Sequence, residues 1–320
     1  MRLDIPPLFD HLSSCQRILL AGAGGGYDIL AGLPLYECLR GLGKEVFLAN
    51  LSFSSLRRAR GRWIEIEQIP LVLEVLGDCG GVEEYFPERY LAEWLASRGQ
   101  PAPVYAYKAA GVRVLESIFR HLAKLLELDA LVLVDGGSDI LMRGDEPGLG
   151  TPHEDIASLA AAHCLDLPVR LLVCLGFGVD RYHGVCHAYV LESMAELTAQ
   201  GAFLGGLSLL PSMPEFRAYL QALQYIFQRM PDNESIVNTS IAAAGLGRFG
   251  DDHVLDRTRG QTLFINPLMS TYFAFEVDGV ARRCLYLDAL RETSTRRDVD
   301  LVIDEFRRTV PRRPWLPIPL

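Results

Sequence analysis

An apolar segment that runs into a glycine-rich turn and then into a helical pattern most constrains how this chain can fold. Ile18–Ala21 is typical of a buried strand, and Gly22–Gly26 contains four glycines. The apolar spacing of Ile29–Leu42 predicts a helix, and Glu45–Ala49 predicts a second strand. A strand–helix–strand unit of this length predicts a parallel sheet with a right-handed crossover.

The same alternation of strand and helix signals continues to about residue 200. We expect further strands at Trp63–Ile69, Ala130–Val134 and Val169–Leu175, and helices at Glu83–Arg98, Ala109–Leu126, Pro152–His163 and Val185–Thr198. In residues 201–320 we expect helices at Pro214–Gln228, Ser235–Leu246 and Asp298–Arg308, and a hairpin with an Asp-Gly turn at Phe273–Val280.

These elements predict one α/β domain over residues 1–320. We expect a Rossmann-like, open, mostly parallel sheet with helices on both faces. Residues 1–200 would form the core with a ligand crevice, and residues 201–320 a C-terminal extension packed on it. The apolar segments Gly201–Leu210 and Tyr272–Phe275 are expected either in the buried core or at a homodimer surface.

The net charge of −9 argues against nucleic acid and anionic membranes as partners. No apolar run is long enough to span a membrane, and no secretory signal is visible. The seven cysteines form no CxxC pair, so we expect a reduced, cytoplasmic protein. The basic cluster Arg57–Arg62 is expected to be a solvated loop, although it could reach a phosphate because it follows the second strand.

The glycine-rich turn is a candidate ligand site. Gly24, Gly25, Gly26 and Tyr27 would open a helix N-terminus, which favours anions, whereas Asp28 could bind a hydroxyl, an amine or a divalent cation. The alternative is that the glycines only permit a tight turn and that Asp28 interacts with the helix dipole.

A nicotinamide cofactor is not expected at this turn. Tyr27 stands where the dinucleotide fingerprint has its third glycine, and Asn50 stands where the ribose-binding acid belongs. Asn50 is instead a candidate ligand-binding residue.

A second candidate site begins with Asp135, which follows a predicted buried strand together with Gly136, Gly137 and Asp139. Crowded carboxylates repel each other unless a cation, an ammonium group or an arginine neutralises them, and Arg143 is a candidate counter-ion. Hard divalent cations prefer oxygen ligands. We therefore expect Mg²⁺ or Mn²⁺, with Asp28, Asp135 and Asp139 as its ligands.

A third turn contains Gly178 and Asp180, followed by His183 and His187. Zinc is not expected, because a third ligand is missing, but one histidine could act as a general base. We select His187, with Asp135, Asp139 and Asp180 as the other candidate catalytic residues. The alternative is a histidine bonded to a loop carbonyl at the start of a helix. For Thr151–Glu154, a structural capping box is favoured over catalysis.

The motifs together resemble those of a bacterial and archaeal family described as domain of unknown function 1152. The resemblance depends on Gly24–Asp28, Asp135–Glu146, Gly150–Asp155 and Leu175–Asp180 followed by His187. It implies a Rossmann-like domain without an established activity. The shorter segment Asp135–Met142 is similar to a stretch of D-glutamate cyclases, from which it departs at Ser138, Asp139 and Leu141.

The turns that carry these acids follow parallel strands, so they should converge on one crevice at the carboxyl edge of the sheet. We expect an enzyme of hydrolase or lyase type that acts on a small polar metabolite, nucleotide-like or amino-acid-like, with a divalent cation. The alternative is a non-catalytic sensor or scaffold that binds a small ligand in the same crevice.

Overall fold

The computed structural model describes residues 4–81, 85–260 and 263–318. Within them, nine strands form one sheet in the order β3-β4-β5-β2-β1-β6-β7-β9-β8. The strands are β1 Arg17–Gly22, β2 Glu45–Leu51, β3 Arg62–Ile66, β4 Ile69–Val75, β5 Val104–Tyr107, β6 Ala130–Asp135, β7 Val169–Leu175, β8 Phe203–Ser208 and β9 Thr271–Glu276.

The five central strands, β5-β2-β1-β6-β7, are parallel, and two strands at each edge pair antiparallel. The expected open, mostly parallel α/β sheet is therefore confirmed. β1, β6 and β7 are neighbours, so the turns that follow them meet at the same edge. Tyr272 and Phe275 lie in β9, between β7 and β8, and are buried. The segment Tyr272–Phe275 therefore belongs to the core and not to an exposed surface.

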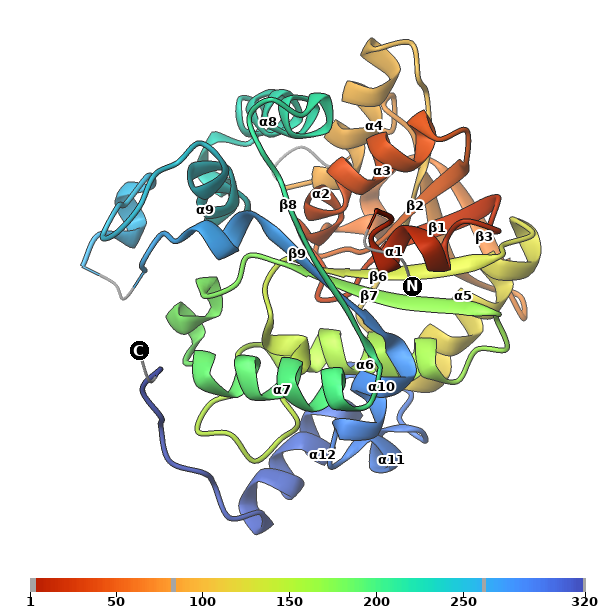
Figure 1. The fold of residues 1–320 in the computed structure, drawn as a ribbon. Coiled ribbons are helices and arrows are strands. Elements are labelled where there is room, and N and C mark those ends of the chain that lie inside the picture. The colour runs from red at the N-terminus through yellow and green to blue at the C-terminus, as the bar shows by residue number, and fades with distance from the viewer. Residues whose placement is uncertain (1–3, 82–84, 261–262, 319–320) are drawn as a thin grey trace.

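Helices cover both faces of the sheet (Figure 1). One face carries α1 Pro7–His11, α2 Asp28–Ala31, α3 Leu33–Gly41, α4 Pro87–Ser97 and α8 Pro214–Phe227. The other carries α5 Val112–Leu125, α6 Pro152–His163, α7 His187–Ala199, α10 Val277–Arg283, α11 Leu287–Leu290 and α12 Arg296–Thr309. None of the helices in the described part of the chain combines the length and apolar character needed to cross a bilayer.

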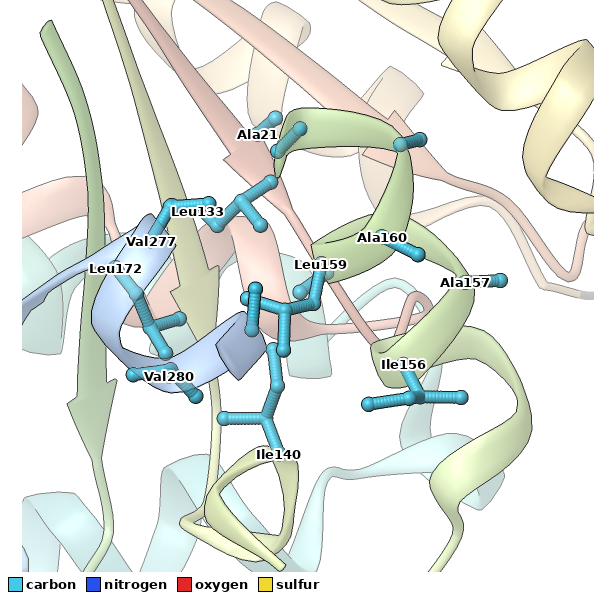
Figure 2. Close-up of a cluster of buried hydrophobic side chains, with 14 of the residues drawn as sticks. Ala21, Leu133, Ile140, Ile156, Ala157, Leu159, Ala160, Leu172, Val277 and Val280 are labelled. Atoms are coloured by element: carbon cyan, nitrogen blue, oxygen red, sulfur yellow. The ribbon is translucent and has the colours of Figure 1, made fainter. Parts of the chain in front are cut away.

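Helix α6 lies in the middle of one face and carries acidic residues in its first turn. Figure 2 shows Leu159 beside Leu133 of β6, with Leu172 of β7 and Val280 of α10 nearby. Ala157 and Ala160 are also buried and lie on the side of the helix away from Leu133, whereas the Ser158 hydroxyl on the sheet side donates to the carbonyl of Ala23 at 2.8 Å. This packing fixes the start of α6 at the carboxyl edge.

Three expected elements are wrong. The strand expected at Trp63–Ile69 is interrupted at Glu67 and Gln68, where the chain turns from β3 into β4. The helix expected at Ile29–Leu42 is divided into α2 and α3, because Pro34 has no N–H to donate to the carbonyl of Leu30. The hairpin expected at Phe273–Val280 does not form, because Asp278 and Gly279 lie inside α10. A Cβ on Gly279 would collide with Ala202, so this glycine serves close packing rather than a turn.

A buried polar network supports the end of β2 beneath the glycine-rich turn. The Asn50 side-chain N–H donates to the carbonyl of Gly26 and to Glu88, both at 2.8 Å. The Ser54 hydroxyl donates to the second Glu88 oxygen at 3.4 Å. Asn50 and Glu88 have no exposed surface, and burial raises the pKa of the Glu88 carboxyl above its ordinary value.

We expect the substitution Glu88→Gln to stabilise the protein increasingly as pH rises. The raised pKa means that the folded state holds the Glu88 proton more tightly than the unfolded chain does. The wild-type protein therefore loses stability as pH rises above 4.5, the ordinary glutamate value, and glutamine avoids that loss. Urea unfolding of both proteins between pH 4 and pH 8 measures the difference, and a difference that is constant with pH would contradict the prediction.

Candidate functional site

The acidic residues of the three turns meet in one cavity of about 600 Å³ at the carboxyl edge of β1, β6 and β7. Asp28 follows the glycine-rich turn, Asp135 ends β6, Asp139 begins the next short 3-10 helix, and Asp180 lies in the turn after β7. Asp155, in the first turn of α6, joins them. The expected convergence of these turns therefore appears in the structure.

Three of these carboxylates lie close enough to share one ion. Asp28, Asp135 and Asp155 each offer an oxygen, and these three oxygens lie within 4.8 Å of one another. Asp135 and Asp155 are each only 3% exposed, and one oxygen of each, Asp135 Oδ2 and Asp155 Oδ1, has no hydrogen-bond partner. Buried charged oxygens without partners cost free energy unless a cation or a proton balances them.

Burial and mutual repulsion both disfavour the charged form of the cluster. Removal of water raises the pKa of Asp135 well above its ordinary value, and the charges of Asp139 and Asp180 raise it further. Burial also raises the pKa of Asp155, and the charges of Asp139 and Asp135 raise it further. Burial also raises the pKa of Asp28 to about 7. A bound cation would reverse these shifts, because it favours the ionised carboxylates.

Four of the aspartates that line the cavity each lie directly against a glycine that has no room for a side chain. The pairs are Asp155 with Gly24, Asp28 with Gly136, Asp180 with Gly137, and Asp139 with Gly150. A Cβ on Gly24 would lie 2.5 Å from Asp155 Oδ1, and one on Gly136 would lie 2.8 Å from Asp28 Oδ1. The glycines that the sequence places in these turns therefore make space for carboxylates.

The N–H groups of the glycine-rich turn are occupied by the protein itself. Gly24 N–H donates to Asp28 Oδ2 at 2.7 Å, Gly26 N–H donates to the carbonyl of Leu51, and the Gly25 backbone also bonds Asp28. Asp28 thus takes the position that an external anion would need. The geometry at this turn favours a cation over the expected anion.

Asp139 and Asp180 hold the loops in place. Asp139 Oδ2 accepts hydrogen bonds from Thr151 N–H at 2.7 Å and from the Thr151 hydroxyl at 3.1 Å. Asp180 Oδ2 accepts from Ser138 N–H at 2.6 Å. The expected capping box at Thr151–Glu154 is therefore wrong, because the Thr151 hydroxyl bonds Asp139 and makes no capping bond to α6.

Several candidate residues lie elsewhere. His187 does not line the cavity. Its ring packs against that of Phe177, and burial lowers its pKa. His183 lines the cavity instead. Arg143 pairs with Asp145 at 2.9 Å and does not face the cavity, so it is no counter-ion for Asp135.

Some of the remaining candidate ligand residues line the acidic cavity, and the others lie away from it. Gly24, Gly25 and Gly136 line the cavity, whereas Gly137 only backs Asp180. The other four do not line it: Gly26 packs against Tyr85 and Phe53, Tyr27 donates its hydroxyl to the carbonyl of Asn233, Asn50 belongs to the buried network, and Gly178 lies beside His187.

Asp155 was not among the predicted site residues. The sequence marks Asp155 only as an acid in the first turn of a helix, and a favourable interaction with the helix dipole explains such a position equally well. Its neighbour Glu154 is also buried and pairs with Arg296 at 3.0 Å, at the rim of the cavity. The distinguishing signal is that Ile156–Ala162 is almost entirely apolar, so a helix that buries this segment also carries the two acids of its first turn into the interior.

Comparison with known proteins gives a family but no activity. Residues 94–306, about two thirds of the chain, match a family described as Protein of unknown function (DUF1152). No curated protein and no solved structure matches the chain. The matched segment includes Asp135, Asp155 and Asp180, and begins after Asp28. The chain belongs to the DUF1152 family, as its motifs predict.

Proposed function

We propose that this chain is an enzyme of hydrolase or lyase type that acts on a small polar metabolite with the help of Mg²⁺ or Mn²⁺. The observation that carries the proposal is the cluster of Asp28, Asp135 and Asp155, whose oxygens lie within 4.8 Å of one another. The two buried oxygens without partners give the cluster a reason to bind an ion. A donor set made only of oxygen suits a hard divalent cation.

The cavity leaves room for a substrate beside the ion. Its volume of about 600 Å³ lies within the range of ligand pockets, roughly 300–1,000 Å³. When bound, a divalent cation polarises a carbonyl or phosphoryl oxygen and lowers the pKa of a coordinated water. His183 lines the same cavity and can accept or donate a proton, while Asp139 and Asp180 hold the surrounding loops.

A non-catalytic sensor is the second candidate function. One observation favours it: His187, the residue expected to carry the proton, lies outside the cavity. Incubation of the Mg²⁺-loaded protein with mixtures of metabolites, followed by NMR, separates the two functions. Consumption of a metabolite that the Asp135→Asn variant leaves unchanged supports the enzyme, whereas binding without any chemical change supports the sensor.

The substitution Asp135→Asn should abolish tight Mn²⁺ binding without lowering the stability of the cation-free protein. The variant loses a direct ligand, for which we expect a loss in affinity of more than about 100-fold, since outer-shell partners alone account for about 10- to 100-fold. It also removes one of several repelling buried charges. Titration calorimetry measures the affinity, and thermal unfolding without cation measures the stability.

The matched control is Asp166→Asn, which removes the same charge from an exposed position outside the cavity and should retain full Mn²⁺ affinity. If Asp135→Asn does not fold, Asp155→Asn supplies the same test at a second ligand. Wild-type protein should be stabilised by about 2.7 kcal/mol at a hundredfold excess of Mn²⁺ over its Kd. Absence of that stabilisation, or unchanged affinity in both variants, would refute the cation site.

The substitution Gly24→Ala should weaken Mn²⁺ binding by about 10- to 100-fold, as expected when a ligand loses its orientation. The new methyl group would lie 2.5 Å from Asp155 Oδ1 and would push that carboxylate out of the cluster. Gly41→Ala is the matched control, because its Cβ would meet no atom within 4 Å and it lies at the end of α3. Equal Mn²⁺ affinities of the two alanine variants would show that Gly24 does not position Asp155.

A further inference from the structure

A second and larger cavity, of about 1080 Å³, lies further along the same edge of the sheet. It is formed by Ser55–Arg58 after β2, by the β3–β4 hairpin, by Lys108 at the end of β5 and by the first half of α5. β5 and β2 are the neighbours of β1 on the side away from β6. The carboxyl edge therefore carries two cavities, and the second one has no acidic cluster.

The charge of the second cavity is opposite to that of the first. Arg57, Arg58 and Lys108 line it, against one acid, Glu65. Arg57 and Arg58 are exposed and form no ion pair within the described residues. Lys108 is held over the segment after β2, where its Nζ donates to the carbonyls of Ser52 at 3.1 Å and Ser54 at 2.8 Å. In a chain with a net charge of −9, this local excess of positive charge favours an anionic group.

The remaining wall of the second cavity is apolar. Trp63, Leu71 and Val114 line it and are only partly buried, and Ile69 is 55% exposed. Apolar walls with a few convergent polar groups are the usual composition of a small-molecule site. The combination fits a ligand that has both an anionic group and an apolar body, because cationic and apolar side chains line the same space.

Two chain segments run from the acidic cavity to the basic one, although the two cavities have no lining residue in common. Phe53, which is 52% exposed, lines the acidic cavity, and Ser55–Arg58 line the basic one. At the start of α12, Ser294 lines the basic cavity and Arg296 lines the acidic one. Residues two positions apart in the chain therefore line the two spaces, which makes the cavities neighbours along the edge.

We infer that the substrate is a phosphate ester of an aromatic compound, the class to which nucleotides belong. The aromatic body would occupy the basic and apolar cavity, and the phosphate would lie between Arg57, Arg58 and the cation held by Asp28, Asp135 and Asp155. Protein-bound Mg²⁺ is commonly shared between carboxylates and substrate phosphates, and arginine binds phosphate through paired hydrogen bonds. This inference rests on the proposed function, and it selects the nucleotide-like substrate over the amino-acid-like one.

The test measures binding of adenosine monophosphate and 4-nitrophenyl phosphate by calorimetry, with and without Mn²⁺. Adenosine and inorganic phosphate are the partial probes. We expect at least one aromatic phosphate to bind about tenfold or more tightly than either partial probe, and more tightly with Mn²⁺ than without it. The double variant Arg57→Ala, Arg58→Ala should weaken that binding by about tenfold or more, as expected for lost charged hydrogen bonds, with Mn²⁺ affinity unchanged.

The matched control is the double variant Arg282→Ala, Arg308→Ala, which removes two exposed arginines outside both cavities and should bind the aromatic phosphate as the wild type does. Failure of both aromatic phosphates to bind, or equal affinity in the two double variants, overturns the inference. If Mn²⁺ itself does not bind, the proposed function fails. Loss of aromatic phosphate binding in Arg57→Ala, Arg58→Ala without Mn²⁺ would then still support the basic cavity as an anion site.

Discussion

The packing of several like-charged carboxylates around one small space is the constraint on which the rest of the site depends. Such groups can approach closely only where the backbone leaves room for them and where something balances their charge. Glycines next to Asp155, Asp28, Asp180 and Asp139 provide the room. The balance is incomplete, because Asp135 and Asp155 each retain a buried oxygen without a partner. This imbalance is the physical reason for a cation at the edge of the sheet.

The central sheet follows directly from the sequence, because strands buried on both faces are apolar along their whole length. β1, β6 and β7 lie where the apolar runs predict them. The strands beyond β2 were harder to predict from the sequence. β5 has only four residues, and β4 had no sequence signal separate from that of β3. Gly279 shows why an Asp-Gly pair misleads, since the same glycine serves a turn or a close helix contact, and only the position of Ala202 distinguishes them.

The candidate site was predictable only as far as neighbouring strands determine it. Asp135 and Asp180 follow adjacent parallel strands, so topology alone brings them together. Asp155 comes from a helix that packs across the sheet, and no local pattern reveals where its first turn points. The choice between His183 and His187 depends on a short 3-10 helix, Val179–His183, which turns the first histidine into the cavity.

The glycine-rich turn shows how one residue changes the sign of a site. A turn of this kind binds phosphate when its N–H groups are free. Here Asp28, four residues after Gly24, accepts a hydrogen bond from that residue and adds its own charge. Any negative group of a substrate must therefore be neutralised by residues other than this turn. Arg57 and Arg58 line the second cavity along this edge and form no ion pair within the described residues, so they can supply this positive charge. A cation on one side and arginines on the other would then share one anionic group.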